Sequence, residues 1–351
     1  MPVEEGVVYD IEWVLANYNG TIYYEDAQGS TENWRLITTT CVGTIAVIAN
    51  VLLLFIVVVM VDTRKKPSMI LVANITIADL LMVINRSFYV VIFYTYVGQD
   101  LERTEFYCKF SSGTYILAFT CSSYTLASLA GTRYQGIVRP FGKLSRHPRR
   151  FRHILITSVV IWIMSILISI PQYILATNGN DTFSDTHQCE YLPHFTTLAK
   201  THEILFVTLS YILPLFIIGF CYGGISLYLR KSSRELREMD KHSLNVTKVV
   251  KRRTRLAKSF VCVVIAFALM YFPSMLYRIL VQFQIVGHNT ALYMSGVATI
   301  TCYLNTCVNP IMFCFFTKNI RQGFIDMFFC RWKKIKLYNV NSTNSRTRTK
   351  T

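Results

Sequence analysis

The chain has 351 residues, of which 52% are hydrophobic and only 16% are charged, and its formal net charge is +16. A soluble domain is expected to have about 25% charged residues, and here the apolar residues form long uncharged runs, which excludes an ordinary soluble protein. A nucleic-acid-binding function is disfavoured too, because the basic residues lie in the segments between those runs. We find no sign of a second domain, an internal repeat or a low-complexity segment.

In chain order, Met1 to Trp34 is polar and acidic and lacks the basic start and apolar centre of a signal peptide. The first apolar run is therefore expected to act as its own insertion signal. Seven runs then satisfy the need for about 20 mostly apolar residues per membrane-spanning helix. They lie at roughly 36–61, 69–95, 106–137, 154–176, 202–229, 257–284 and 291–316.

A short amphipathic stretch follows at roughly 318–329 and is expected to lie on the membrane surface as a helix. The predicted fold class is therefore an all-α membrane protein, a seven-transmembrane helix bundle with a short amphipathic eighth helix. The predicted organisation is an acidic tail, the bundle, the amphipathic helix and a basic tail, at 1–35, 36–317, 318–330 and 331–351.

Lysine and arginine gather in the loops after the first, third and fifth runs and in the C-terminal tail. Such loops stay in the cytosol, so the N-terminus is expected outside and the chain is expected to cross the plasma membrane several times. The outer segments are mainly acidic, which favours a cationic ligand. Part of this bias has a simpler origin, because basic residues are excluded from outer loops in any case.

Three kinds of modification fit this topology. Among the ten cysteines, Cys108 and Cys189 fall in outer segments and can form a disulfide. Asn19 and Asn180 begin outer Asn-x-Thr sequons and are candidate glycosylation sites. Cys330 ends the amphipathic stretch and is either palmitoylated or an unmodified thiol.

Polar residues and prolines inside the apolar runs follow a specific order, and intramembrane polar residues are functional candidates. The set is Asn50, Asp79, Thr132-Arg133-Tyr134, Trp162, Pro214 with Tyr222, Phe267 with Pro273, and Asn305 with Asn309-Pro310-Ile311-Met312-Phe313. Over roughly residues 36–330 this set resembles the rhodopsin-like (class A) G-protein-coupled receptor family. The third and fourth runs look most like neuropeptide-type receptors, with prokineticin receptors among them.

The resemblance implies a sodium ion at a polar cluster within the membrane, and no other cofactor is expected. The matching positions are Asp79, Ser122, Asn305 and Asn309. A lone carboxylate in the bilayer needs a cation or a proton, and hydroxyl and amide oxygens suit a hard cation. The alternative is a protonated Asp79 in a polar network without an ion.

The resemblance also implies the residues that switch the receptor and meet the G protein. They are Thr132, Arg133, Tyr134, Tyr222, Phe267, Pro273, Pro310 and Phe313. Three positions depart from the family pattern: Thr132 replaces the acidic neighbour of Arg133, Tyr271 a tryptophan, and Phe313 a tyrosine. We expect either raised basal activity or a resting state held by other contacts. Coupling is in doubt, because Phe313 has no hydroxyl for a water bridge to Tyr222.

The ligand pocket is expected between the outer halves of the second, third, fifth, sixth and seventh runs. Its candidates are Arg86, Phe88, Tyr115, Phe119, Gln172, Glu203, Tyr271, Tyr277, Arg278, Gln282, Thr299 and Tyr303. Tyr115 stands where receptors for biogenic amines have aspartate, which argues against an amine. No lysine lies between Lys258 and Lys318, so a retinal Schiff base is excluded. Arg86 and Arg278 are candidates for binding a ligand carboxylate, and any of the aromatic residues alternatively serves helix packing.

These observations predict a receptor for a peptide or small basic protein that signals through a heterotrimeric G protein. Serine and threonine in the cytosolic tail are candidate phosphorylation sites for an arrestin-type partner. The alternative is an atypical receptor that is constitutively active or scavenges ligand. A transporter is unsupported because no duplicated half or broken helix pair is visible. An enzyme is unsupported because the ordered intramembrane set holds one carboxylate, Asp79, with no paired base, nucleophile or metal cluster.

Overall fold

The computed structural model describes residues 37–63, 66–96, 101–138, 147–178, 189–190, 196–239 and 264–329. The first helix is Ile37–Met60, and its last turn is a π-helical segment, η1 (Ile56–Met60). It is followed by α2 (Ser68–Tyr96), α3 (Leu101–Val138), α4 (His147–Leu175), β1 (Thr177–Asn178), β2 (Cys189–Glu190), α5 (Thr197–Val207), η3 (Thr208–Ile212), α6 (Leu213–Met239), the helix Val264–Gln282, α8 (His288–Phe316) and α9 (Lys318–Phe328).

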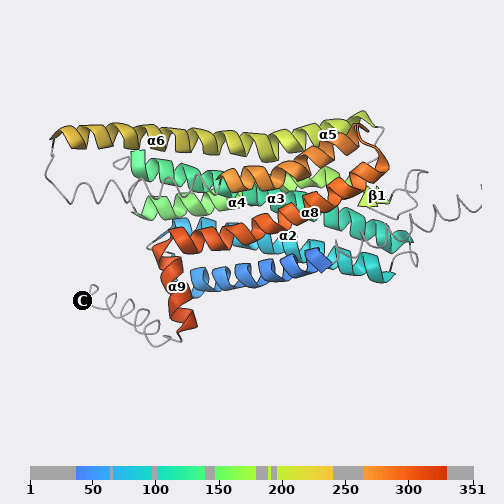
Figure 1. The fold of residues 1–351 in the computed structure, drawn as a ribbon, viewed down its shortest axis with the longest axis horizontal. Coiled ribbons are helices and arrows are strands. Elements are labelled where there is room, and N and C mark those ends of the chain that lie inside the picture. The colour runs from blue at the N-terminus through green and yellow to red at the C-terminus, as the bar shows by residue number, and fades with distance from the viewer. Residues whose placement is uncertain are drawn as a thin grey trace, which may run out of the picture.

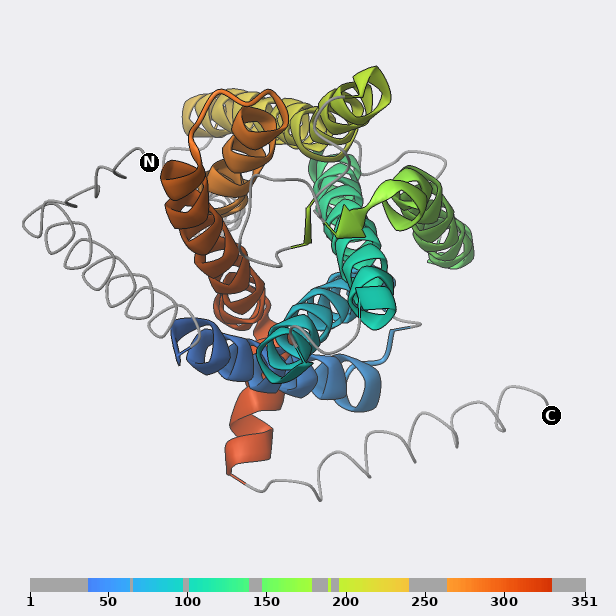
Figure 2. The ribbon, with the colours of Figure 1, turned by 90° about the vertical axis from the view of Figure 1, so that its right-hand side faces the viewer.

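The long helices lie side by side along one direction and form a bundle (Figure 1), which is seen end-on in Figure 2. The segments α5, η3 and α6 follow one another without a break and form a single long helix. The short helix α9 turns away from the end of α8 and leaves the bundle (Figure 1). Its buried Gly323 lies against Ile56 of η1, where a Cβ atom would be 2.5 Å from Ile56 Cγ2.

Six of the described helices are long and apolar enough to cross a membrane. The exception among the long helices is α3, which is 38 residues long but rich in serine, threonine and tyrosine. This helix contacts α2, α4 and α6. A helix covered on several sides by other helices needs less apolar surface than one that faces lipid. The predicted all-α seven-helix bundle is confirmed, and α3 is its central member.

The helix α4 shows the opposite distribution. Its side chains Ile156, Val159, Val160 and Ile163 are exposed. Exposed apolar side chains in a row are expected where a helix faces lipid. Beyond its C-terminal end, β1 and β2 pair in antiparallel fashion, with Thr177 opposite Glu190 and Asn178 opposite Cys189.

Candidate functional site

An aromatic cluster fills the middle of the bundle. Tyr115 and Phe119 of α3 meet Tyr271 and Phe267 from the helix Val264–Gln282 and Phe206 of α5. The ring centroids of Phe119 and Tyr271 are 4.6 Å apart at 81°, and those of Phe267 and Tyr271 are 4.9 Å apart at 63°. Edge-to-face pairs of this kind add to the stability gained from burial. The cluster of these five rings, called the aromatic floor below, therefore connects three helices.

A bidentate ion pair lies next to this floor. Arg278 donates from Nε to Glu203 Oε2 at 2.9 Å and from Nη2 to Glu203 Oε1. The two residues are 4% and 1% exposed. The guanidinium carbon of Arg278 also lies 4.8 Å from the centroid of the Phe206 ring and 6.0 Å from that of Tyr115. This pair joins α5 to the helix Val264–Gln282, so the charge of Arg278 is already balanced within the protein.

The prediction that Arg278 receives a ligand carboxylate stays a prediction, and its pairing with Glu203 sets a condition for it. A ligand anion would have to displace Glu203 and leave a buried carboxylate without its counter-charge, which is costly. The second arginine, Arg86 of α2, donates to Thr299 Oγ1 of α8 at 3.3 Å. This hydrogen bond connects α2 to α8.

Several other predicted pocket residues are buried in the bundle. Gln172 of α4 and Gln282 are buried, and both polar atoms of the Gln172 amide and Nε2 of Gln282 have no hydrogen-bond partner within the described residues. Tyr303 of α8 is buried next to Gly43 of the first helix. Buried polar groups normally bind another group. The two glutamines are thus able to bind a ligand.

Two further predicted pocket residues are less buried, and their part in a pocket stays a prediction. Phe88, on α2, is 59% exposed. Tyr277 is partly buried on the helix Val264–Gln282, beside the paired Arg278.

A polar cluster lies deeper in the bundle and consists of Asp79, Ser122, Asn305 and Asn309 (the Asp79 cluster). Asp79 of α2 accepts a hydrogen bond from Ser122 Oγ at 3.2 Å and another from Asn309 Nδ2 at 2.7 Å. All four side chains are buried. Nδ2 of Asn305 has no hydrogen-bond partner within the described residues.

The donor set of the Asp79 cluster fits the sodium ion that the sequence suggested. A carboxylate, a hydroxyl and amide oxygens are hard ligands of the type that alkali and alkaline-earth cations prefer. An amide that donates through Nδ2 presents Oδ1 instead after a half-turn. Within the described residues no group of three or more His, Cys, Asp or Glu side chains is arranged to hold a metal ion.

At the inner end of α3, Thr132 does not restrain Arg133. The Thr132 hydroxyl donates to the backbone oxygen of Leu129 at 2.8 Å, within its own helix. Arg133 instead lies within electrostatic reach of Tyr222 on α6. Tyr134 packs on α6 at Gly224, where a Cβ atom would be 2.6 Å from the Tyr134 ring. The inner end of α3 therefore contacts α6.

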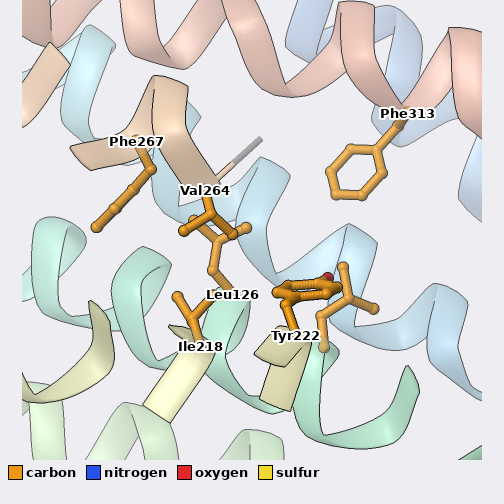
Figure 3. A pocket seen from close by; sticks show the side chains of 7 residues that line it. Leu126, Ile218, Tyr222, Val264, Phe267 and Phe313 are labelled. Carbon is orange, nitrogen blue, oxygen red and sulfur yellow. The ribbon is translucent and has the colours of Figure 1, made fainter. Parts of the chain in front are cut away.

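A small apolar pocket lies between Tyr222 of α6 and Phe313 of α8 (Figure 3). It is lined by Leu126, Leu129, Ile218, Tyr222, Val264, Phe267 and Phe313. Pockets of this kind stay dry when few polar groups line them. The phenyl ring of Phe313 thus faces an apolar space at the position where a tyrosine would carry a hydroxyl.

Two of the predicted switch prolines lie inside helices, Pro273 within Val264–Gln282 and Pro310 within α8. The π-helical segment η3 ends just before Pro214. It directs Tyr211 toward the neighbouring helix, where the hydroxyl donates to the backbone oxygen of Ala268 at 2.7 Å. The η3 segment thereby ties α5 and α6 to the helix Val264–Gln282.

Cys108 on α3 is disulfide-bonded. The strand β2, which contains Cys189, contacts α3. The pairing of Cys108 with Cys189 stays a prediction from topology and family resemblance. The glycosylation candidates Asn19 and Asn180, the palmitoylation candidate Cys330 and the cytosolic tail lie outside the described residues.

Sequence reasoning missed two residues that touch the ion pair. Phe206 lies three residues after Glu203, a spacing that places both on one helix face and was available from the sequence. His202 is buried, with Nδ1 3.8 Å from Glu203 Oε1. A third missed residue, Ser274, shares a 2.8 Å hydrogen bond with the hydroxyl of Tyr115. No sequence signal indicated that contact, because it joins two helices.

The chain is similar in sequence to known membrane receptors. The family described as 7 transmembrane receptor (rhodopsin family) matches residues 49–313. Galanin receptor type 1 of Rattus norvegicus is 28% identical over 231 residues, which are 64% of this chain and 62% of that receptor. Apelin receptor A of Danio rerio is 25% identical over 280 residues, 74% of this chain and 72% of the receptor. Neuropeptide Y receptor type 6 of Mus musculus is 25% identical over 315 residues, 85% of this chain and 81% of the receptor. The chain thus spans less than two thirds of the first of these relatives.

Proposed function

Since the chain belongs to the rhodopsin family of seven-transmembrane receptors, we propose that it binds an extracellular peptide or small basic protein and signals through a heterotrimeric G protein. The family consists of receptors, so the chain is a multi-pass membrane receptor and not an enzyme. The N-terminus is proposed to face the outside of the plasma membrane, because the basic loops belong on the cytosolic side.

The observation that carries the peptide proposal is the ion pair within the predicted pocket, because it determines which groups are left to bind a ligand. With Arg278 balanced by Glu203, the recognition groups are the aromatic floor and the amides of Gln172 and Gln282. Amide side chains donate and accept hydrogen bonds, as peptide groups do. The acidic outer segments favour a ligand with positive charge. By their names, the relatives are receptors for galanin, apelin and neuropeptide Y, which supports a peptide ligand.

Signal transfer is proposed to run through the inner ends of α3 and α6. Arg133, Tyr134 and Tyr222 gather there. The departures at Thr132 and Phe313 do not remove this surface. They change the balance between resting and active arrangements. Phosphorylated tail residues are proposed to recruit an arrestin-type partner.

The Asp79 cluster is proposed to hold a sodium ion that favours the resting arrangement. When bound, such an ion supplies the positive charge that a buried carboxylate requires. Asp79, Ser122, Asn305 and Asn309 would be its protein ligands.

The test is a screen of cationic peptides against the full chain in transfected cells, with saturable binding and G-protein activation measured on the same cells. We expect at least one peptide to bind saturably and to raise activation above the basal level. Gln282→Leu should weaken that binding, whereas Phe216→Leu, at an exposed position of α6, should leave it unchanged.

Two outcomes would contradict the proposal in different ways. Saturable binding without activation would replace it with the scavenging receptor described above. A screen without any bound peptide, on cells with normal surface expression, would overturn the peptide ligand itself.

A further inference from the structure

The hydroxyl of Tyr271 reaches toward α2. It donates to Sδ of Met82 on α2, with 3.7 Å between oxygen and sulfur. The ring is fully buried and is fixed by edge-to-face contacts with Phe119 and Phe267. A thioether sulfur is a weak acceptor. The hydrogen bond to Met82 is therefore weak, and the Tyr271 oxygen is still able to bind another group.

The same hydroxyl lies at the Asp79 cluster. Met82 is one helical turn beyond Asp79 on α2, so both side chains share one face of that helix. The Tyr271 hydroxyl also lies close to the side-chain amide of Asn305 and within electrostatic reach of Asp79. Nδ2 of Asn305 is buried and has no hydrogen-bond partner within the described residues. Two buried polar side chains thus meet beside a buried carboxylate.

The chemistry of that region calls for a positive charge. Asp79 is fully buried, and its hydrogen bonds with Ser122 and Asn309 come from neutral groups. A buried carboxylate is costly without a cation or a proton. A small hard cation takes oxygen ligands. The indole of a tryptophan offers only an N–H donor, whereas a tyrosine offers an oxygen.

We propose that the Tyr271 hydroxyl is an additional oxygen ligand of a monovalent cation at the Asp79 cluster. The Tyr271 ring would then belong both to the cation site, which rests on the sodium ion proposed above, and to the aromatic floor of the proposed ligand pocket. A ligand that moves the Tyr271 ring withdraws an oxygen from the cation, and a bound cation holds the ring in place.

The experiment measures the melting temperature of the purified full chain in detergent as NaCl replaces choline chloride at constant ionic strength. The variants are Tyr271→Phe, Asp79→Asn and, as matched control, Tyr211→Phe. The control loses a hydroxyl that donates to a backbone oxygen on the neighbouring helix. Melting in choline chloride alone reports whether each variant is folded.

We expect sodium to raise the melting temperature of the unaltered chain and of Tyr211→Phe with the same half-saturating concentration. Tyr271→Phe should need about tenfold more sodium, as for the loss of one polar contact of about 1.4 kcal/mol. Asp79→Asn should abolish the response. A Tyr271→Phe titration that coincides with the unaltered chain would overturn the proposal. So would the absence of a sodium-specific shift in the unaltered chain, or a shift that persists in Asp79→Asn.

Discussion

Arg278 and Glu203 form a bidentate ion pair across two helices, and both side chains are almost completely withdrawn from solvent. Such a pair is a constraint on helix position, because each charge is costly to bury alone. In this receptor the pair joins α5 to the helix Val264–Gln282, where the ligand pocket is proposed to lie. Its strength should therefore be visible both in stability and in ligand response.

Breaking the pair from one side should destabilise the receptor. Glu203→Leu or Arg278→Leu leaves an uncompensated buried charge and is expected to cost about 3–5 kcal/mol. The double variant Glu203→Leu with Arg278→Leu leaves no such charge and should recover much of that loss. Melting temperatures in detergent check this, and a double variant no more stable than the worse single variant would show that the pair contributes little as a unit.

Two glycines on transmembrane helices should respond oppositely to alanine. A Cβ atom on Gly113 would lie 2.4 Å from Cγ of Tyr173, whereas one on Gly219 meets nothing within 4 Å. Gly113→Ala should therefore lower stability by about 1–3 kcal/mol through overpacking between α3 and α4. Gly219→Ala should be neutral or slightly stabilising, because alanine favours a helix over glycine. Thermal melting of the two variants side by side is the measurement, and equal effects would contradict the helix contact.

Restoring a hydroxyl at Phe313 should favour the active arrangement. In the apolar pocket of Figure 3, the hydroxyl of Phe313→Tyr has no polar lining group other than Tyr222, and an unsatisfied buried hydroxyl costs about 1–3 kcal/mol. A water bridge to Tyr222 in the active arrangement would relieve that cost. We expect higher basal G-protein activation in Phe313→Tyr. The gain should disappear when Tyr222→Phe is added, and a gain that survives this second change would assign it to another contact.

The fold followed from the sequence more completely than the pocket did. The positions of the helices could be predicted from the long apolar runs and the ordered polar residues. In lipid every backbone group must be hydrogen-bonded within the protein, which leaves few alternatives to a helix bundle. The run at 106–137 was predicted as a span from its length and motifs, and the helix α3 forms there although it is rich in serine, threonine and tyrosine. The amphipathic stretch likewise formed α9, at Lys318–Phe328.

The pairing of Glu203 with Arg278 did not follow from the sequence. A sequence gives the spacing of residues along one helix, whereas this contact depends on how two helices are rotated against each other. The π-helical segment η3 adds to the difficulty, since it interrupts the 3.6-residue period between Glu203 and Tyr222. The Asp79 cluster was easier, because its members were recognised together from the family pattern.

We propose that this chain couples to a G protein and that the absence of an acid at position 132 weakens its resting state. The Thr132 hydroxyl donates to the backbone oxygen of Leu129 and carries no charge, so it does not form an ion pair with Arg133. Thr132→Asp would supply that partner, worth about 1–2 kcal/mol, or a factor of about 5–30 in the ratio of resting to active receptor. The most direct measurement is basal G-protein activation in transfected cells without ligand, with Thr132→Asn as the uncharged control and surface expression matched. We expect measurable basal activation in the unaltered chain and in Thr132→Asn, and lower activation in Thr132→Asp. Equal activation in all three receptors would show that the missing acid at position 132 does not set the resting state.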